Sequence, residues 1–307
     1  MTSIYKKIIS IILICAVAVA TGLSVGKIYL DMNTAPTGLS DMDTVYKASE
    51  EEVVALYNRS NGARVADFNA IELWQIAEYK LSLQDKFKRV MTGRVVSAGQ
   101  PVNMKSTKTK NGDVYTYEKL SPSKNVMGIT TPNICSLISY NKKLPNQVNI
   151  NTSGVFKDST AASKDLSATF SGTGQIYTQA QYEEIFHTMP DRSVMPYIIS
   201  DKTCDETCIS QVVDNNDGTY TFVISLQGEY LEKAALAYSY EILFSSGYSL
   251  PEWSNAKITV TIDSNFMFKT INYIENYTVY NAPVIGKAGV ADDFVDQFIY
   301  GDEAFAA

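Results

Sequence analysis

Apolar and polar positions follow two different periods along this chain, and the change falls near Phe87. Before Phe87, apolar residues recur every three or four positions, which predicts a helix across residues 71–83. An earlier helix is expected after Ser49, because a serine N-cap followed by three glutamates suits the positive end of a helix dipole. Asn61-Gly62 would end that helix. The folded part of the chain is therefore expected to open with two helices.

From Phe87 onward, short runs rich in β-branched and aromatic residues alternate with clusters of Gly, Pro, Asn and Ser, which is typical of strands and turns. Asn111-Gly112 predicts a hairpin turn between two such runs. A third helix is expected across residues 178–187. The predicted strands are KFKRVMTGRVVSA (86–98), NGDVYTYEKL (111–120), NICSLISY (133–140), QVNINTSGVF (147–156), SATFSG (167–172) and PYIIS (196–200).

The last third of the chain shows the same signals more clearly. Helices are segregated from runs of antiparallel strands, which is the α+β pattern. We expect a curved antiparallel sheet with helices packed on one face, preceded by an N-terminal hydrophobic helix. The elements predicted in this third are a hairpin across 208–226 that turns at Asp217-Gly218, an amphipathic helix across 228–247, and a hairpin across 256–280 that turns at Asp263-Ser264-Asn265.

Residues 8–26 form the longest apolar run of the chain and follow two lysines. As a helix, these 19 residues are about long enough to cross a ~30 Å hydrocarbon core, so they suit a signal anchor. Ala18-Val19-Ala20 also matches a signal-peptidase site, so a cleaved signal peptide is the alternative. The lysines predict a cytoplasmic N-terminus. We therefore expect a single-pass protein of the cell membrane with the bulk of the chain outside the cell, or a secreted protein if the segment is cleaved.

The expected domain organisation follows from this N-terminus. Residues 1–30 would be the signal anchor or signal peptide, and residues 31–48 a polar spacer. Residues 49–307 would form an extracytoplasmic α+β domain. Its length allows one domain or two lobes, 49–200 and 201–307.

Two stretches, EEEVVALYNRSN (50–61) and AKITVTIDSNFMFKTINYIENYTVY (256–280), resemble segments of exported proteins of Gram-positive gut bacteria. In outline, with an N-terminal helix, a meander of strands and a closing strand pair, the chain is also similar to half-barrel lipoprotein carriers of the LolA/LppX type. This resemblance implies an open, curved sheet whose concave face holds an acyl chain. The lipobox usual in LppX-type proteins is missing, because Ile14 rather than a small residue precedes Cys15.

Composition limits the partners and the kinds of active site that this chain can have. The chain has 307 residues, 45% of them apolar, and a net charge of −7, which argues against a nucleic-acid partner. His187 is the single histidine, which removes most histidine-based metal and triad chemistry, and no metal or cofactor is expected. His187 could act as a general base oriented by a carboxylate. It could equally be a histidine that meets the negative end of its own helix.

Cys204 and Cys208 are four residues apart in TCDETC. In a loop or an irregular turn this spacing permits a disulfide, and we expect one because the domain is predicted to lie in an oxidising compartment. Cys135 would remain unpaired, as a small buried hydrophobic residue.

Charge is unevenly distributed. Residues 80–124 hold ten Lys and Arg against three Asp and Glu, whereas the tail from Pro283 holds five acids and one lysine. The basic stretch suits an anionic partner outside the cell, such as lipid headgroups or wall polyanions. A solvated hairpin edge, on which lysines block edge-to-edge pairing, explains it as well. The candidate contacts to an anionic partner are Lys86, Lys88, Arg89, Arg94, Lys105, Lys108 and Lys110.

Taken together, these features predict a non-enzymatic, membrane-tethered extracytoplasmic protein that binds or scaffolds a component of the cell envelope, with an apolar or anionic ligand on its curved sheet. A structural or assembly component of a surface protein complex is the alternative. A hydrolase built on carboxylates, such as Glu183 with Glu184 or Asp191, is the third hypothesis.

Overall fold

The computed structural model describes residues 45–97, 100–126, 129–130, 133–246, 249–279 and 290–306. The apolar segment 8–26, the spacer up to residue 44 and Cys15 lie outside this part of the chain. Within the ranges described, no helix is long and apolar enough to cross a membrane.

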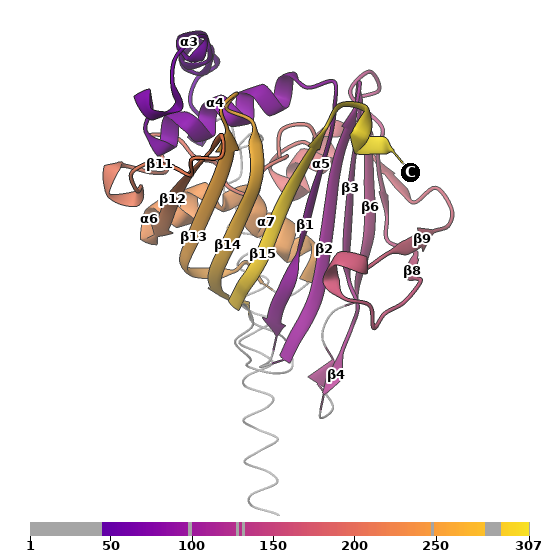
Figure 1. Cartoon of the computed structure of the whole chain (residues 1–307). Coiled ribbons are helices and arrows are strands. Elements are labelled where there is room, and N and C mark those ends of the chain that lie inside the picture. Colours follow the sequence, from indigo (N-terminus) through magenta and orange to yellow (C-terminus); the bar gives the residue numbers. More distant parts are fainter. Residues whose placement is uncertain are drawn as a thin grey trace, which may run out of the picture.

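One antiparallel sheet of eleven strands organises the described chain (Figure 1). Its order is β10-β7-β6-β3-β2-β1-β15-β14-β13-β12-β11. Two small two-stranded sheets, β4-β5 and β8-β9, accompany it. The strands of the large sheet are β1 (Lys86–Ser97), β2 (Gln100–Asn111), β3 (Val114–Ser121), β6 (Ile134–Asn141), β7 (Val148–Asn151), β10 (Gln175–Tyr177), β11 (Val213–Asp214), β12 (Thr219–Gln227), β13 (Glu252–Asp263), β14 (Phe268–Thr278) and β15 (Val290–Tyr300). The remaining strands are β4 (Asn125–Val126), β5 (Ile129–Thr130), β8 (Gly154–Phe156) and β9 (Ala168–Phe170).

The sheet consists of two meanders that meet at its centre. From β1 the chain runs outward to β10 at one edge, crosses to β11 at the other edge, and returns inward to β15. β15 then pairs antiparallel with β1, with Phe87 opposite Tyr300 and Thr92 opposite Val295. Strands from both stretches, 49–200 and 201–307, therefore belong to one sheet.

Five α-helices lie in the described chain: α3 (Glu50–Ser60), α4 (Ala70–Leu83), α5 (Gln179–Phe186), α6 (Gly228–Ala234) and α7 (Leu236–Ser246). The three helices predicted first are confirmed, and α3 has a complete capping box between Ser49 and Glu52. The single helix predicted across 228–247 is wrong, because it breaks at Ala235. The carbonyl of Ala234 there accepts a hydrogen bond from Ile198 N (2.9 Å) instead of continuing the helix.

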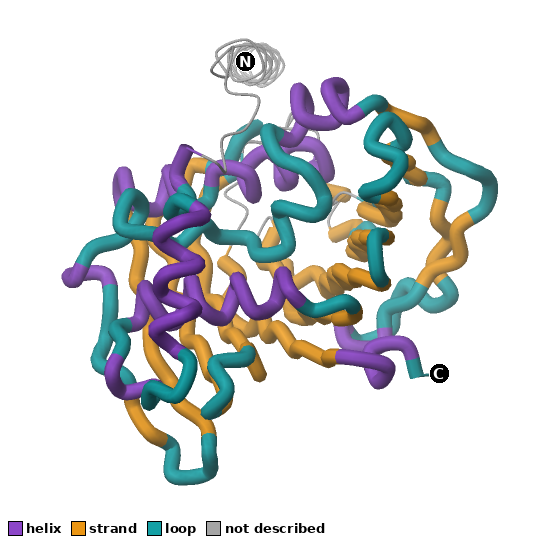
Figure 2. Tube along the Cα trace, turned by 90° about the horizontal axis from the view of Figure 1, so that it is seen from above, coloured by secondary structure: helices purple, strands orange, loops and turns teal. Residues whose placement is uncertain are grey.

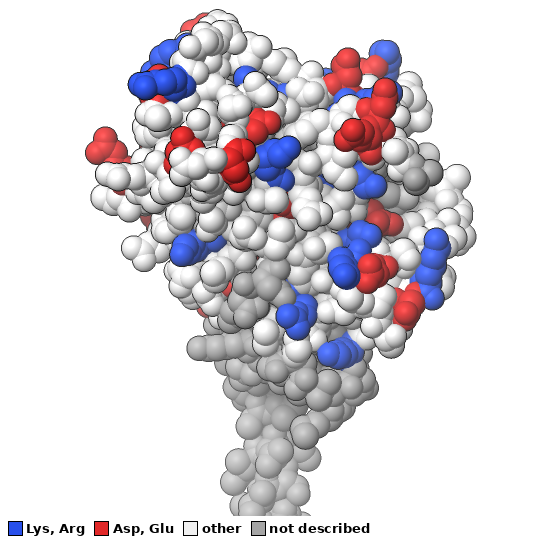
Figure 3. Space-filling view, viewed as in Figure 1, with Lys and Arg blue, Asp and Glu red and all other residues white. Residues whose placement is uncertain are grey.

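The helices cover one face of the curved sheet, which confirms the α+β class (Figure 2). Helix α4 packs on β12 and β14, and α6 packs on β12 and β13. The main core lies between these layers and contains Trp74, which is fully buried and stands edge-to-face to Phe268 (5.3 Å). On the other face of the sheet, the segment from β8 to β9 packs on part of the strands, and basic and acidic side chains are interspersed over the part of this face that Figure 3 shows.

A small separate core lies under the β8-β9 hairpin. It consists of Leu120, Cys135 and Leu166, all buried. Gly154 comes so close to Cys135 that a Cβ atom there would stand 2.2 Å from the sulfur, so this hairpin requires glycine at that position. Cys135 is thus the buried hydrophobic residue that the sequence predicted.

Three strand predictions differ from the structure. The run predicted across 147–156 divides into β7 and β8, which belong to different sheets. Residues 196–200 form no strand. Ile198 N donates to Ala234 O of α6 and Ser200 N donates to Thr203 Oγ1 (3.0 Å), so neither N–H group bonds to a neighbouring strand. In the hairpin predicted across 208–226, only Val213–Asp214 pairs as a strand before the turn, while Cys208 ends a short 3-10 helix. The turn itself is confirmed, with Gly218 at φ +84°.

Candidate functional site

The basic stretch lies at the centre of the sheet, on β1, β2 and β3, and its side chains divide between the two faces. Arg89 (2% exposed) and Lys108 (7% exposed) face the helices. For these two residues the interpretation as a solvated hairpin edge is therefore wrong, because both are buried on central strands and have anionic partners. Lys88 is half-buried and Arg94 is exposed. The remaining candidates bond to the chain itself: Lys86 to Asp302 (2.6 Å), Lys105 to Leu166 O (2.9 Å) and Lys110 to Ser82 O (2.8 Å).

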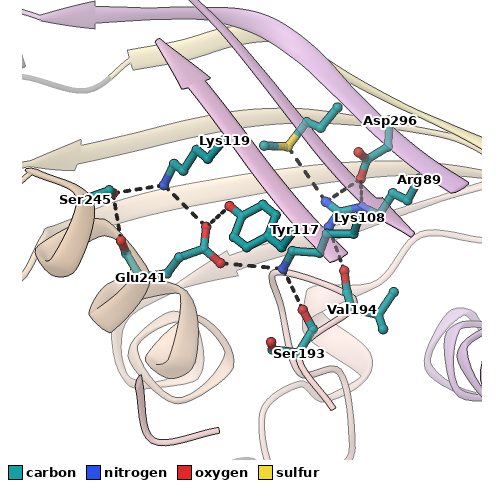
Figure 4. A network of polar contacts seen from close by, with 10 residues as sticks. Arg89, Lys108, Tyr117, Lys119, Ser193, Val194, Glu241, Ser245 and Asp296 are labelled. Atoms are coloured by element: carbon teal, nitrogen blue, oxygen red, sulfur yellow. Dashed lines mark hydrogen bonds and ion pairs between the residues drawn. The ribbon is translucent and has the colours of Figure 1, made fainter. Parts of the chain in front are cut away.

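Arg89 forms a fully buried ion pair with Asp296 of β15 (Figure 4). Its Nε donates to Asp296 Oδ2 (2.8 Å), and the same oxygen accepts from the hydroxyl of Tyr273 (2.7 Å). Arg89 also donates to Val194 O (2.6 Å). Burial alone would lower the pKa of Arg89, but the charge of Asp296 raises it, so the guanidinium stays protonated.

Glu241 of α7 is the counter-ion of two buried lysines (Figure 4). Its carboxylate lies 3.5 Å from Lys108 Nζ and 3.3 Å from Lys119 Nζ, and it accepts a short hydrogen bond from Tyr117. Burial opposes its ionisation, but the two lysines lower the pKa of Glu241 to about 2. Burial lowers the pKa of Lys108 to about 8 against the opposing charge of Glu241. Lys108 also donates to Ser193 O (2.6 Å).

A third carboxyl, Glu275 of β14, is buried with no cation bound to it among the described residues. It accepts hydrogen bonds from the hydroxyls of Tyr197 (2.7 Å) and Tyr238 (3.5 Å). Burial raises the pKa of Glu275 to about 7, and the two hydroxyls oppose this shift only partly. In acidic solution the folded protein therefore holds Glu275 in its neutral form.

We expect Glu275→Gln to remove a pH dependence from stability. The carboxyl titrates near its ordinary value of 4.5 when unfolded but near 7 when folded, so wild-type stability falls as pH rises from 4.5 to 7. The shift corresponds to a loss on the order of 3 kcal/mol. Urea unfolding of both proteins at pH 4.5 and pH 8 measures it. Glu275→Gln should be more stable than wild type only at the higher pH. Glu232→Gln is the control, because Glu232 is exposed, and it should match wild type at both pH values. An equal stability difference between Glu275→Gln and wild type at both pH values would contradict the expectation.

These buried charges fix the segment between α5 and α6 against the sheet. Arg89 and Lys108 hold the carbonyls of Val194 and Ser193, so the segment lies on the helix-covered face with Met195 and Tyr197 buried. Only a cavity of about 20 Å³, room for about one water molecule, remains beside Lys108. Along these central strands the concave face of the sheet is therefore filled by the chain itself.

The large open space lies at one end of this face. It is a groove of about 690 Å³ between α3, α4 and the segment 191–202, which we call the α3-α4 groove. Phe87 and Tyr115 of the sheet form part of its lining, together with Val53, Leu81 and Ile199. Its volume falls within the ~300–1,000 Å³ of small-molecule sites. The groove can therefore accommodate a small-molecule ligand.

Charged side chains of both signs surround the groove. Three are cations and three are anions, so their formal charges cancel. They are Lys47, Arg192, Lys202, Glu50, Glu78 and Asp191.

Two of the three carboxylates of the hydrolase hypothesis lie beside cations, and the third is exposed. Glu183 accepts from Arg192 (2.6 Å), Asp191 lies 3.4 Å from Lys142, and Glu184 is exposed. His187 ends α5 in the left-handed conformation (φ +54°) and packs on the ring of Tyr240. His187 therefore lies at the C-terminal end of its own helix, which is the second of the two interpretations that the sequence left open.

Cys204 and Cys208 lie side by side as the sequence suggested, but as free thiols. Both are buried, and burial raises the pKa of Cys204, with Cys208 adding to the shift. The disulfide expected from the spacing is not formed in this structure, and it stays a prediction for the oxidised protein. In the part of the chain that the structure describes, no group of three or more His, Cys, Asp or Glu residues is placed to hold a metal.

Apart from Asp191, the groove-lining residues were not predicted as candidate site residues from the sequence, and neither were the three buried acids Asp296, Glu241 and Glu275. Asp296 carried a signal, because Phe294 and Phe298 flank it at alternate positions, as in a strand with one buried face. Compared with known proteins, the chain matches no family model, and no curated protein is significantly similar to it.

Proposed function

We propose that this chain is a membrane-tethered, extracytoplasmic binding protein that holds an apolar small molecule in the α3-α4 groove. The tether would be the segment 8–26, with its two preceding lysines on the cytoplasmic side. The observation that carries the proposal is the groove of about 690 Å³ with a largely apolar lining. Ligand sites of this kind are concave and apolar, with few polar groups.

The groove is a better position for the ligand than the middle of the curved sheet. There, the buried ion pairs and the segment from Ser193 to Tyr197 occupy the concave face. A ligand at the groove needs none of these contacts to break. The groove is also bordered by Lys47 and Ser49, where the spacer from the membrane joins the domain, so it lies next to the tether along the chain.

Photolabelling tests this proposal. The full chain in phosphatidylcholine nanodiscs would be irradiated with diazirine-labelled dodecanol, and the labelled peptides identified by mass spectrometry. We expect labelling to concentrate in residues 47–53 and 75–87. Ser82→Trp, which places an indole at the groove wall, should reduce this labelling about tenfold.

Ser225→Trp is the matched control, since Ser225 is exposed on β12 and does not line the groove. It should label as wild type does. Label spread evenly over the domain, or labelling of the groove peptides that Ser82→Trp leaves unchanged, would refute a ligand site in the groove.

A further inference from the structure

We propose that the α3-α4 groove selects neutral or zwitterionic amphiphiles over amphiphiles with a single net charge. This inference rests on the function proposed above and adds the class of ligand. Its basis is that the six charged side chains of the groove have no net charge and that most are already engaged with one another or with the chain.

The charges on the α4 side are engaged first by one another. Lys47 Nζ lies 3.8 Å from Glu78 Oε1 and donates to Arg192 O (3.0 Å). Glu78 also accepts from the indole N–H of Trp74 (3.2 Å). The guanidinium of Arg192 pairs in turn with Glu183 (2.6 Å). Neither cation therefore needs a ligand as its counter-ion.

The charges on the opposite side are engaged as well. Asp191 lies 3.4 Å from Lys142 Nζ, and Lys202 Nζ donates to Lys47 O (2.9 Å). Of the six groove charges, four belong to ion pairs among the described residues, and the two that remain, Glu50 and Lys202, have opposite signs. A head group of either charge would therefore lose water without a net opposite charge to compensate it, which is unfavourable. A neutral head group has a much smaller desolvation cost, and a zwitterion can lie along paired charges of both signs.

The basic stretch of the sequence does not change this balance. Arg89 and Lys108 lie deeper, each with a carboxylate partner, and Lys110 donates to Ser82 O at the groove wall. The anionic ligand that the basic stretch suggested is therefore less favoured in the groove than a neutral one.

Competition against the photolabel tests the selectivity. Four competitors share the same twelve-carbon chain: dodecanol, dodecylphosphocholine, dodecanesulfonate and dodecyltrimethylammonium. Each would displace diazirine-labelled dodecanol from the full chain in nanodiscs at pH 7, with concentrations expressed per mole of lipid. We expect the first two to reach half-displacement at about tenfold lower concentration than the two ions.

A change of groove charge should change the selectivity. Glu78→Gln keeps an acceptor for Trp74 but leaves the groove with a net positive charge, so dodecanesulfonate should gain about tenfold. Lys47→Gln should favour dodecyltrimethylammonium instead. Glu72→Gln is the control on the same helix, because Glu72 pairs with Arg59 outside the groove and glutamine also suits a capping box.

The outcomes separate this inference from the proposal beneath it. Groove labelling that dodecanesulfonate or dodecyltrimethylammonium displaces as well as dodecanol does would overturn the selectivity and leave the binding function standing. Absence of groove labelling would overturn both. If Glu78→Gln and Lys47→Gln left the selectivity unchanged, the charged side chains around the groove would not be its cause, and the inference would be overturned.

Discussion

Replacement of Arg89 by methionine is expected to lower the free energy of unfolding by about 3–5 kcal/mol. The substitution leaves Asp296, which is fully buried, with only the hydroxyl of Tyr273 as a side-chain partner among the described residues. It also removes the donor to Val194 O, so the segment between α5 and α6 loses one of its attachments. Urea denaturation of the purified protein at pH 7 measures the loss.

The double variant Arg89→Met, Asp296→Asn identifies the cause. With neither charge of this pair left and an acceptor retained for Tyr273, it should recover most of the stability. Arg64→Met is the surface comparison, because Arg64 pairs with Asp67 in an exposed position, and it should change stability little. If Arg89→Met were as mild as Arg64→Met, Arg89 and Asp296 could not be the buried pair described here.

Replacement of Glu241 by leucine is expected to have an effect of similar size, about 3–5 kcal/mol, because two lysines lose one shared counter-ion. Lys108 and Lys119 are both less than a tenth exposed, so water cannot replace the carboxylate. Tyr117 also loses its acceptor. Unfolding by urea at pH 7 would measure this loss.

The pH dependence adds an independent check on Glu241. Its pKa is about 2 when folded against an ordinary 4.5, so its stabilising contribution is complete above pH 4.5 and is lost as pH falls toward 2. The stability difference between wild type and Glu241→Leu should shrink over that interval. Glu229→Gln, which breaks an exposed pair with Lys233, should show little effect at pH 7. A loss for Glu241→Leu that stays constant from pH 6 to pH 3 would contradict the ionised role of Glu241.

Local signals predicted the helices and turns of this fold, because these depend on residues close in sequence. The capping box of α3 and the turn at Gly218 are examples, since each requires particular residues within a few positions. The segment 196–200 has the composition of a strand, but the chain that packs around it gives its N–H groups other partners. The break at Ala235 arises from the same contact between the two segments.

The candidate site could not be predicted in the same way, because it depends on contacts between distant segments. A count of charges along the sequence cannot show that Arg89 meets Asp296, which lies 207 residues away. The sequence therefore indicates only an acidic tail where the structure has a central strand. The α3-α4 groove similarly combines residues near 50, 80 and 195, none of which forms a motif.

The pairing of β1 with β15 has a consequence for synthesis. The first strand of the sheet has its second neighbour only in β15, so this central pairing cannot form until residues 290–300 have emerged. Chains grow at about 5–20 residues per second, and contacts of such long sequence separation form slowly. During this time β1 and β14 each present an unpaired edge. A chaperone that shields strand edges, or retention of the growing chain at a membrane channel, would protect the nascent protein until its C-terminus arrives.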